Sequence, residues 1–329
     1  MSILSSILAS RSGLMANSLR AETVSNNIAN AQDENYSKRT VQVAEALGGG
    51  VQVTGIARAM DKAMDELYRT ELSFASTQDA MANVLNVYTA QLGDLDSETS
   101  IPSLLSAFQN DLGLMSNDPG DTSLQQEVLL SAKALANSLR EANSALSQAQ
   151  KASYFGIESD LVTANKAMNE IARINADIGR AVPGSATYAN LQDRRAEQLD
   201  TLAAVMQVQV SYDGENRATV HTVGGQTLVK AGYVNELSFD RATGELTSGG
   251  EVITPGGAGR RGSNEGSLAG YIKLATETVP QSQLELDEVA RALIEGFEDA
   301  DASLAVGQPG LFTDAGSALA ATFPVGLAG

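Results

Sequence analysis

The sequence contains no cysteine and no tryptophan, and it has a single histidine, His221. Without cysteine there is no disulfide, no thiolate metal site and no cysteine nucleophile. With one histidine, a metal site built from several histidines is excluded, and any histidine catalysis has to use His221. Aromatic residues make up only 5% of the chain, which disfavours an apolar ligand pocket. We therefore expect no catalytic residue, no cofactor and no metal ion.

Positive charge and long apolar runs are also scarce. Lys and Arg total 22 against 40 Asp and Glu, so the formal net charge is −18, and such a surface repels nucleic-acid phosphates. No stretch of about 18 apolar residues is present, so no membrane insertion is expected. The first basic residue is Arg11 and serines interrupt the first apolar residues, unlike a cleaved secretory signal. We expect a protein that stays in the cytosol or leaves the cell without such cleavage.

Three short patterns resemble chemical sites, and each lacks a required part. Residues 257–262 match G-x-G-x-x-G, but a predicted helix follows instead of a second parallel strand, which favours a flexible loop. The acidic run 94–98 resembles the start of a calcium loop, but threonine and leucine stand at the sixth and twelfth positions. His221 lies in a strand-like segment, and no G-x-S-x-G motif exists to supply a nucleophile.

The first thirty residues show a narrow helical pattern. Apolar residues recur at steps of three, four and seven, which places them on one face of a helix, whereas the other face is rich in Ser and Asn with few charges. This apolar stripe consists of Ile3, Ile7, Leu14, Ala21, Val24 and Ile28. Residues 38–45 and 51–58 alternate apolar and polar side chains around a glycine run, which predicts two extended strands or a hairpin.

Longer helical patterns follow. Residues 60–95 keep a rhythm of three and four, residues 101–116 predict a shorter helix, and residues 186–206 predict another. Between them, residues 122–182 follow a near-heptad repeat, which predicts one very long helix or two helices with a kink near Gly156. The repeat consists of Leu124, Val128, Ala132, Leu135, Leu139, Ala142, Leu146, Ala149, Ile157, Leu161, Ala164, Met168, Ile171 and Ile178.

A change of amino-acid composition separates a β segment from these helices. From Gln207 to Ile253 the chain is rich in Val and Thr, and helix returns over residues 267–300, where Pro280 should start or kink the second half. The predicted fold class is mainly α with a β insert: a long-helix bundle or coiled-coil rod plus a small antiparallel β domain. The predicted domains are 1–59 (N-terminal helix and hairpin), 60–206 (long-helix bundle), 207–263 (inserted β domain), 264–302 (return helices) and 303–329 (Gly/Ala-rich tail).

One motif ends the first helix. It reads Ser25-Asn26-Asn27-Ile28-Ala29-Asn30 and is followed by Tyr36-Ser37. Taken alone, it is typical of an Asn-rich helix end with a tyrosine packed nearby. The motif also resembles the N-terminal signature of the bacterial flagellar axial proteins, the family of rod, hook and hook-associated proteins. Further segments are similar to the hook-associated members, in the expected order: 50–58, 129–137, 191–200 and 266–270.

The sequence departs from this family at two places. Glu34-Asn35 stand where the family has Pro-Gly before the tyrosine. The family also ends in a C-terminal helix that pairs with the N-terminal one, and we expect this chain to lack that helix.

The resemblance implies a structural adaptor at the junction of the flagellar hook and filament, exported by the type III route without a cleaved signal peptide. The implied partners are the hook protein, hook-associated protein 3, further copies of the chain, and an export chaperone that binds the missing C-terminal helix. The apolar stripe is then the predicted assembly interface, and we hypothesise that residues 1–30 become ordered on assembly. The alternatives are another axial protein (hook, rod or hook-associated protein 3), a cytoplasmic coiled-coil signalling protein, or a secreted enzyme with an unrecognised site.

Overall fold

The computed structural model describes residues 3–33, 35–47, 49–92, 97–256, 261–304 and 308–314. The chain forms two compact units. Unit 1 comprises Met1–Thr77 and Glu158–Ala269, and unit 2 comprises Gln78–Ile157 and Gly270–Gly329. Helices α2 (Lys62–Leu92) and α4 (Thr122–Ile178) contribute residues to both units.

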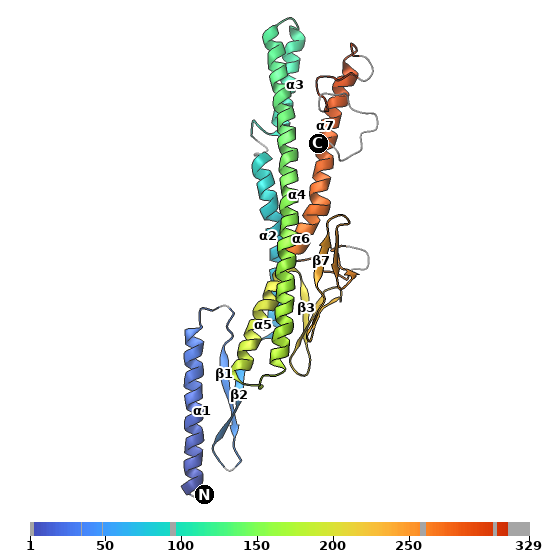
Figure 1. Ribbon diagram of the computed structural model, residues 1–329. Helices are drawn as coiled ribbons and strands as arrows, with labels where there is room; N and C mark the ends of the chain where they lie inside the picture. The colour runs from blue at the N-terminus through green and yellow to red at the C-terminus, as the bar shows by residue number, and fades with distance from the viewer. Residues whose placement is uncertain are drawn as a thin grey trace. The chain divides into compact units, whose positions relative to one another are not determined.

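Unit 1 begins with what we call the N-terminal arm, which consists of α1 (Ile3–Ala29), β1 (Arg39–Glu45) and β2 (Val51–Arg58). The two strands pair antiparallel, and α1 lies beside the strand pair (Figure 1). The helix expected over 3–30 and the strands expected over 38–45 and 51–58 are therefore confirmed.

The remainder of unit 1 is built around α5 (Ala186–Val205). Ser185 caps its start by accepting a hydrogen bond from the Tyr188 amide at 3.1 Å, as serine side chains do at helix N-termini. On the other side of the α4–α5 turn, Ile174 and Ile178 pack against Leu191.

The β insert contains two antiparallel sheets that lie within unit 1. The first has strand order β3-β4-β5-β6 and the second has β7-β8-β9. Their bounds are β3 Val208–Tyr212, β4 Ala218–Thr222, β5 Thr227–Lys230, β6 Tyr233–Val234, β7 Leu237–Asp240, β8 Glu245–Ser248 and β9 Glu251–Val252. The mainly α fold with a β insert is thus confirmed, whereas the boundaries 207–263 remain a prediction for a separate domain.

Unit 2 has an apolar core cluster built from three helices. It contains α3 (Ile101–Asn117), the first part of α4, and α7 (Val279–Ala300). Phe108, Phe297 and Phe312 form a ring cluster with centroids 5.3–5.5 Å apart, and Leu135 of α4 packs in the same core. Such offset and edge-on ring pairs stabilise a core beyond the area that they bury.

The heptad positions of α4 are buried, as the repeat predicts. From Val128 to Ile178 nearly all of them are buried, and α4 is one continuous helix. Gly156 does not break this helix. A Cβ at that position would lie 2.7 Å from the Tyr271 ring, so the glycine serves a close side-chain approach.

The return to helix after the β insert has an irregular start. Helix α6 (Ser267–Lys273) leads into a π-helix, η1 (Leu274–Thr278), and then into α7 with Pro280 in its first turn. Pro280 stands at the point where the π-helix gives way to α7, in agreement with the expectation that it starts or kinks the second half of this helix.

The first half of α2 buries polar rather than apolar side chains. Its apolar residues Met64, Leu67 and Phe74 are exposed, whereas Arg69 and Ser73 are buried. The Ser73 hydroxyl donates to the Ala203 carbonyl at 2.6 Å, and this bond ties α2 to α5. The 3–4 rhythm therefore predicts the helix correctly but does not identify the face that packs in unit 1.

The partly buried carboxyl of Asp160, in unit 1, has a perturbed pKa. Burial raises the pKa of Asp160 to about 6, against the opposing effect of the Ser267 hydroxyl, which donates to it at 2.5 Å.

No described helix is long and apolar enough to cross a membrane. The described residues contain no His, Asp and Glu cluster that could hold a metal ion. Most of the acidic run 94–98, most of the glycine-rich run 257–262 and most of the tail 303–329 lie outside the described residues.

Candidate functional site

All six residues of the apolar stripe lie on the surface of α1. Ile3 is 82% exposed, Leu14 is 72% exposed and Ile28 is 71% exposed; Ile7, Ala21 and Val24 are exposed as well. Leu4 and Leu8, which lie outside the stripe, are exposed as well. The predicted assembly interface is therefore free to meet another surface, and its role in assembly remains a prediction.

The opposite face of α1 packs against the β1–β2 pair. Ala16 and Thr23 are buried there, and the Ser12 hydroxyl accepts a hydrogen bond from the Val51 amide at 3.1 Å. The approach is close, because a Cβ on Gly50 would lie 2.5 Å from Ser12 Oγ. Small residues therefore occupy the inner face, and the large apolar side chains are left on the outer face.

The motif at the end of α1 joins the helix to β1 through Asn27. Its side-chain amide donates to the Arg39 carbonyl and accepts from the Arg39 amide, both at 2.9 Å. The Tyr36 hydroxyl donates to the same Asn27 oxygen at 2.9 Å. An asparagine amide can donate and accept at once, so Asn27 takes the place of a neighbouring strand at the start of β1.

The other motif residues are not gathered into this contact. The Asn30 side chain donates to the Asn26 carbonyl at 2.9 Å and so closes the end of α1. Four of the motif residues, Ser25, Asn26, Ile28 and Ala29, are exposed, and Ser37 is half-buried. The structure therefore explains the motif locally as a joint between α1 and β1.

The Arg39 side chain continues this connection to α5. It donates to Asp193 and to Asn190, both at 2.6 Å, and its guanidinium stacks 4.7 Å from the centre of the Tyr36 ring. Arg58, at the end of β2, reaches the other oxygen of Asp193 at 2.5 Å. Asp193 belongs to the segment 191–200 that resembles the family, and here it binds both strands of the arm.

Two more charged residues of the same segment bind other parts of unit 1. Asp200 pairs with Arg69 of α2 at 2.7 Å, and burial raises the pKa of the Asp200 carboxyl although Arg69 opposes the shift. Arg195 is buried, donates to the Asn216 carbonyl and stacks 4.8 Å from the Tyr212 ring; burial lowers its pKa. Helix α5 thus connects the arm, α2 and the β insert.

Two further helix asparagines repeat the contact that Asn27 makes. Asn165 of α4 accepts from the Leu237 amide at 2.8 Å and donates to its carbonyl at 2.9 Å. Asn175 makes the same pair with Ala218, both at 2.8 Å. Sequence reasoning missed these two residues, because an asparagine on a helix has no periodic signature that distinguishes it from a surface residue.

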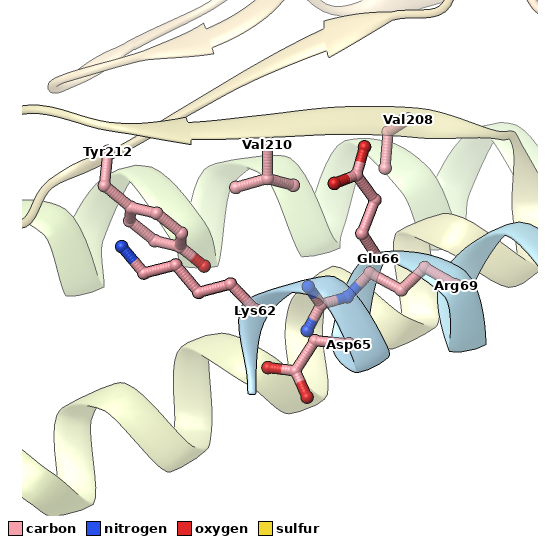
Figure 2. Close-up of a pocket in the computed structure, with 7 residues that line it drawn as sticks. All are labelled: Lys62, Asp65, Glu66, Arg69, Val208, Val210 and Tyr212. Atoms are coloured by element: carbon pink, nitrogen blue, oxygen red, sulfur yellow. The ribbon is translucent and has the colours of Figure 1, made fainter. Parts of the chain in front are cut away.

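A small pocket lies between the start of α2 and β3 (Figure 2). Its volume is about 140 Å³, less than the roughly 300–1,000 Å³ that ligand sites usually occupy. The Lys62 amine lies 5.2 Å from the centre of the Tyr212 ring, and the Glu66 side chain extends toward the strand. Its charges are balanced, since two acidic and two basic residues line it: Lys62, Asp65, Glu66 and Arg69. We assign no chemistry to this pocket.

His221 lies on β4, next to Thr227 of β5. Its Nδ1 lies 3.2 Å from the Thr227 hydroxyl on the adjacent strand. This contact lies within the sheet, in agreement with the strand position expected from the sequence.

Known proteins similar to this chain are flagellar. A family model described as the flagellar hook-associated protein FlgK helical domain matches residues 90–304, and one described as flagella basal body rod protein matches residues 7–36. Flagellar hook-associated protein 1 of Salmonella typhimurium is 24% identical over 337 aligned positions, covering 93% of this chain and 60% of the relative. The Bacillus subtilis relative of the same name is 23% identical, covering 80% and 58%.

A solved structure has a similar fold. It is described as the flagellar hook junction protein FlgK from Burkholderia pseudomallei, with a TM-score of 0.58 and 20% identity, covering 74% of this chain and 44% of that one. The chain spans about 60% of the length of the curated relatives above. Because the helical-domain model covers more than half of the 329 residues, the chain belongs to the FlgK family of flagellar hook-associated proteins.

Proposed function

We propose that this protein is a structural adaptor at the junction of the flagellar hook and filament, and that it polymerises through α1 and its helical domain. The observation that carries the proposal is the exposed apolar stripe of α1, in a chain whose family is hook-associated. An apolar surface of this kind on a folded helix marks a surface that another protein covers.

The charge of α1 suits contact between identical copies. The helix holds only three charged residues, Arg11, Arg20 and Glu22, although the chain as a whole has a net charge of −18. Copies packed side by side along this helix would repel little, while burial of each large apolar side chain contributes about 1.5–3 kcal/mol.

The proposed partners come from the family resemblance, and the words hook-associated and hook junction in the names of the relatives support a place at the hook. We propose contacts with the hook protein on one side and hook-associated protein 3 on the other, with further copies of the chain in the same layer. We also propose that the protein binds an export chaperone and leaves the cell by type III export without a cleaved signal. Its proposed location is the extracellular flagellum. We propose a structural role and no enzymatic activity, since the relatives are structural proteins of the flagellum.

A deletion strain tests this function. Without the protein, cells should fail to swarm, and electron microscopy should show bare hooks while flagellin is shed into the medium. Purified protein should also bind isolated hooks in a sedimentation assay. Normal filaments in the deletion strain would exclude the junction role.

A further inference from the structure

Two arginines face each other where the arm meets α5. Arg39 and Arg58 are direct partners in the register of β1 and β2, so two like charges lie side by side across the strand pair. Like charges directly opposite each other destabilise paired strands. Only 9% of the Arg39 side chain and 10% of the Arg58 side chain is exposed, so solvent screens their repulsion weakly.

Asp193 of α5 lies between the two guanidinium groups. Its Oδ2 is 2.6 Å from Arg39 Nη2, and its Oδ1 is 2.5 Å from Arg58 Nε. Each carboxylate oxygen therefore has its own arginine. We call these three residues the arginine–aspartate joint.

Beyond this joint and the hydrogen bond from Arg39 to Asn190, few contacts hold the arm to α5. Among the described residues of the arm, the buried apolar side chains are Ala16 and Val41. One backbone bond, from the Ile56 amide to the Gly184 carbonyl at 2.8 Å, supports the joint. The arm is thus attached by polar contacts, whereas the α4–α5 pair has an apolar core.

We propose that Asp193 is a positioning residue for assembly, and that the arginine–aspartate joint sets the direction in which the arm presents its apolar stripe. The connection is continuous: Asn27 of α1 holds the Arg39 backbone, and the Arg39 side chain holds α5. The assembly part of this proposal rests on the proposed function, whereas the joint itself acts in the single chain.

Replacing Asp193 with asparagine tests the joint in the single chain separately from its role in assembly. D193N leaves two buried like charges opposite each other without a counterion, which strongly destabilises the contact between the arm and α5. The partners of Asp193 lie on the arm, so the arm should detach while α4 and α5 stay packed. Amide exchange in β1 and β2 should rise about 100-fold or more.

Pulsed electron paramagnetic resonance measures the position of the arm directly, and the cysteine-free chain makes labelling specific. We would place spin labels at Gln52→Cys on β2 and Lys166→Cys on α4, both exposed and both in unit 1. The wild-type background should give one narrow distance distribution, and D193N a broad one. E197Q is the matched control, because it removes one exposed carboxylate from the same helix and should leave the distribution narrow.

A second variant keeps the test decisive if D193N fails to fold. The double variant R58Q/D193N removes the bridge together with one of the two repelling charges, so it should fold and still give a broad distribution. A narrow distribution in the folded variant, or equal broadening in E197Q, overturns the proposal.

Binding to isolated hooks then tests the link to assembly. D193N should weaken binding at least tenfold, while E197Q binds as the wild type does. If the arm of D193N is loose and binding is unchanged, the positioning role is overturned. If the wild type itself does not bind hooks, the proposed function fails, and the resonance result on the joint is unaffected.

Discussion

Truncating three exposed residues of the apolar stripe should block assembly without unfolding the protein. In a triple variant, Ile7, Leu14 and Ile28 become alanine; these side chains are 59%, 72% and 71% exposed. Burying such a side chain completely is worth about 1.5–3 kcal/mol. Scaled by the area still available and by what alanine retains, the loss on assembly is about 2–5 kcal/mol per subunit, or about 30-fold or more in critical concentration.

The same three substitutions should leave the stability of the single chain almost unchanged. All three side chains point away from the β1–β2 pair, and alanine is the best helix former, so the free energy of unfolding should stay within about 0.5 kcal/mol. Circular dichroism during urea unfolding measures this quantity. Sedimentation with isolated hooks, or of the protein alone at rising concentration, measures assembly.

A matched control uses exposed apolar residues of the β insert, to which no role in assembly is assigned. Val223, Tyr233 and Val252 are 45%, 82% and 43% exposed, and their replacement by alanine removes a comparable apolar area. This control should assemble far better than the α1 triple variant. Equal loss of assembly in both triple variants, or wild-type assembly of the α1 variant, would refute a role of the stripe in assembly.

Three further predictions concern the folded chain. Asn27→Ala removes the hydrogen bonds to the Arg39 backbone, so deuterium exchange of β1 should rise about tenfold or more by mass spectrometry, and unchanged exchange would contradict the role of Asn27. Leu135→Ala, at a fully buried position, should lower the free energy of unfolding by about 2–5 kcal/mol in urea, and a smaller loss would contradict the packed core. For Asp160, the folded pKa of about 6 lies above the ordinary value of 3.8, so its ionisation destabilises the fold above pH 6 and this penalty disappears as the pH falls toward 4. Asp160→Asn should therefore stabilise the protein at pH 8 by about 1–2 kcal/mol after allowance for solvent screening, with no gain at pH 4. Calorimetry at both pH values measures this difference, and an equal effect at both would show that the pKa of Asp160 is not raised.

Periodicity predicted the elements well because the longest helix has a core on one side along most of its length. The heptad repeat of α4 predicted its buried positions from Val128 to Ile178, and the alternation over 38–45 and 51–58 predicted the strand pair. In each case neighbouring residues in the sequence carry the signal, so the pattern needs no knowledge of distant partners.

The same reasoning could not predict which face of α1 or of early α2 turns inward. In both helices the apolar side chains form a stripe, yet the structure buries the small and polar ones. The partners that decide this are distant in sequence: Ser73 meets Ala203, and Arg69 meets Asp200. A helical repeat reports a face, whereas the contact that buries that face depends on the rest of the chain.

The polar joints were the hardest part to predict. Asn27 stood out only as part of the motif that ends α1 and Asp193 only as part of a segment that resembles the family, while Asn165 and Asn175 gave no signal. A hydrogen bond between one side chain and one distant backbone unit leaves no periodic trace, so the structure is needed to see it.

The side-chain amides of Asn27, Asn165 and Asn175 pair with the backbone of a strand, and this has a consequence for the chemical ageing of the protein. Hydrolysis of such an amide consumes water, releases ammonia and leaves a carboxylate, whose second oxygen would face a carbonyl oxygen and turn attraction into repulsion. Water reaches half-exposed Asn27 and Asn165 more readily than Asn175, which has no exposed surface. Material stored for long periods in mild alkali should therefore loosen first at the arm and at β7, and only later beside β4, with a gain of one mass unit recording each lesion.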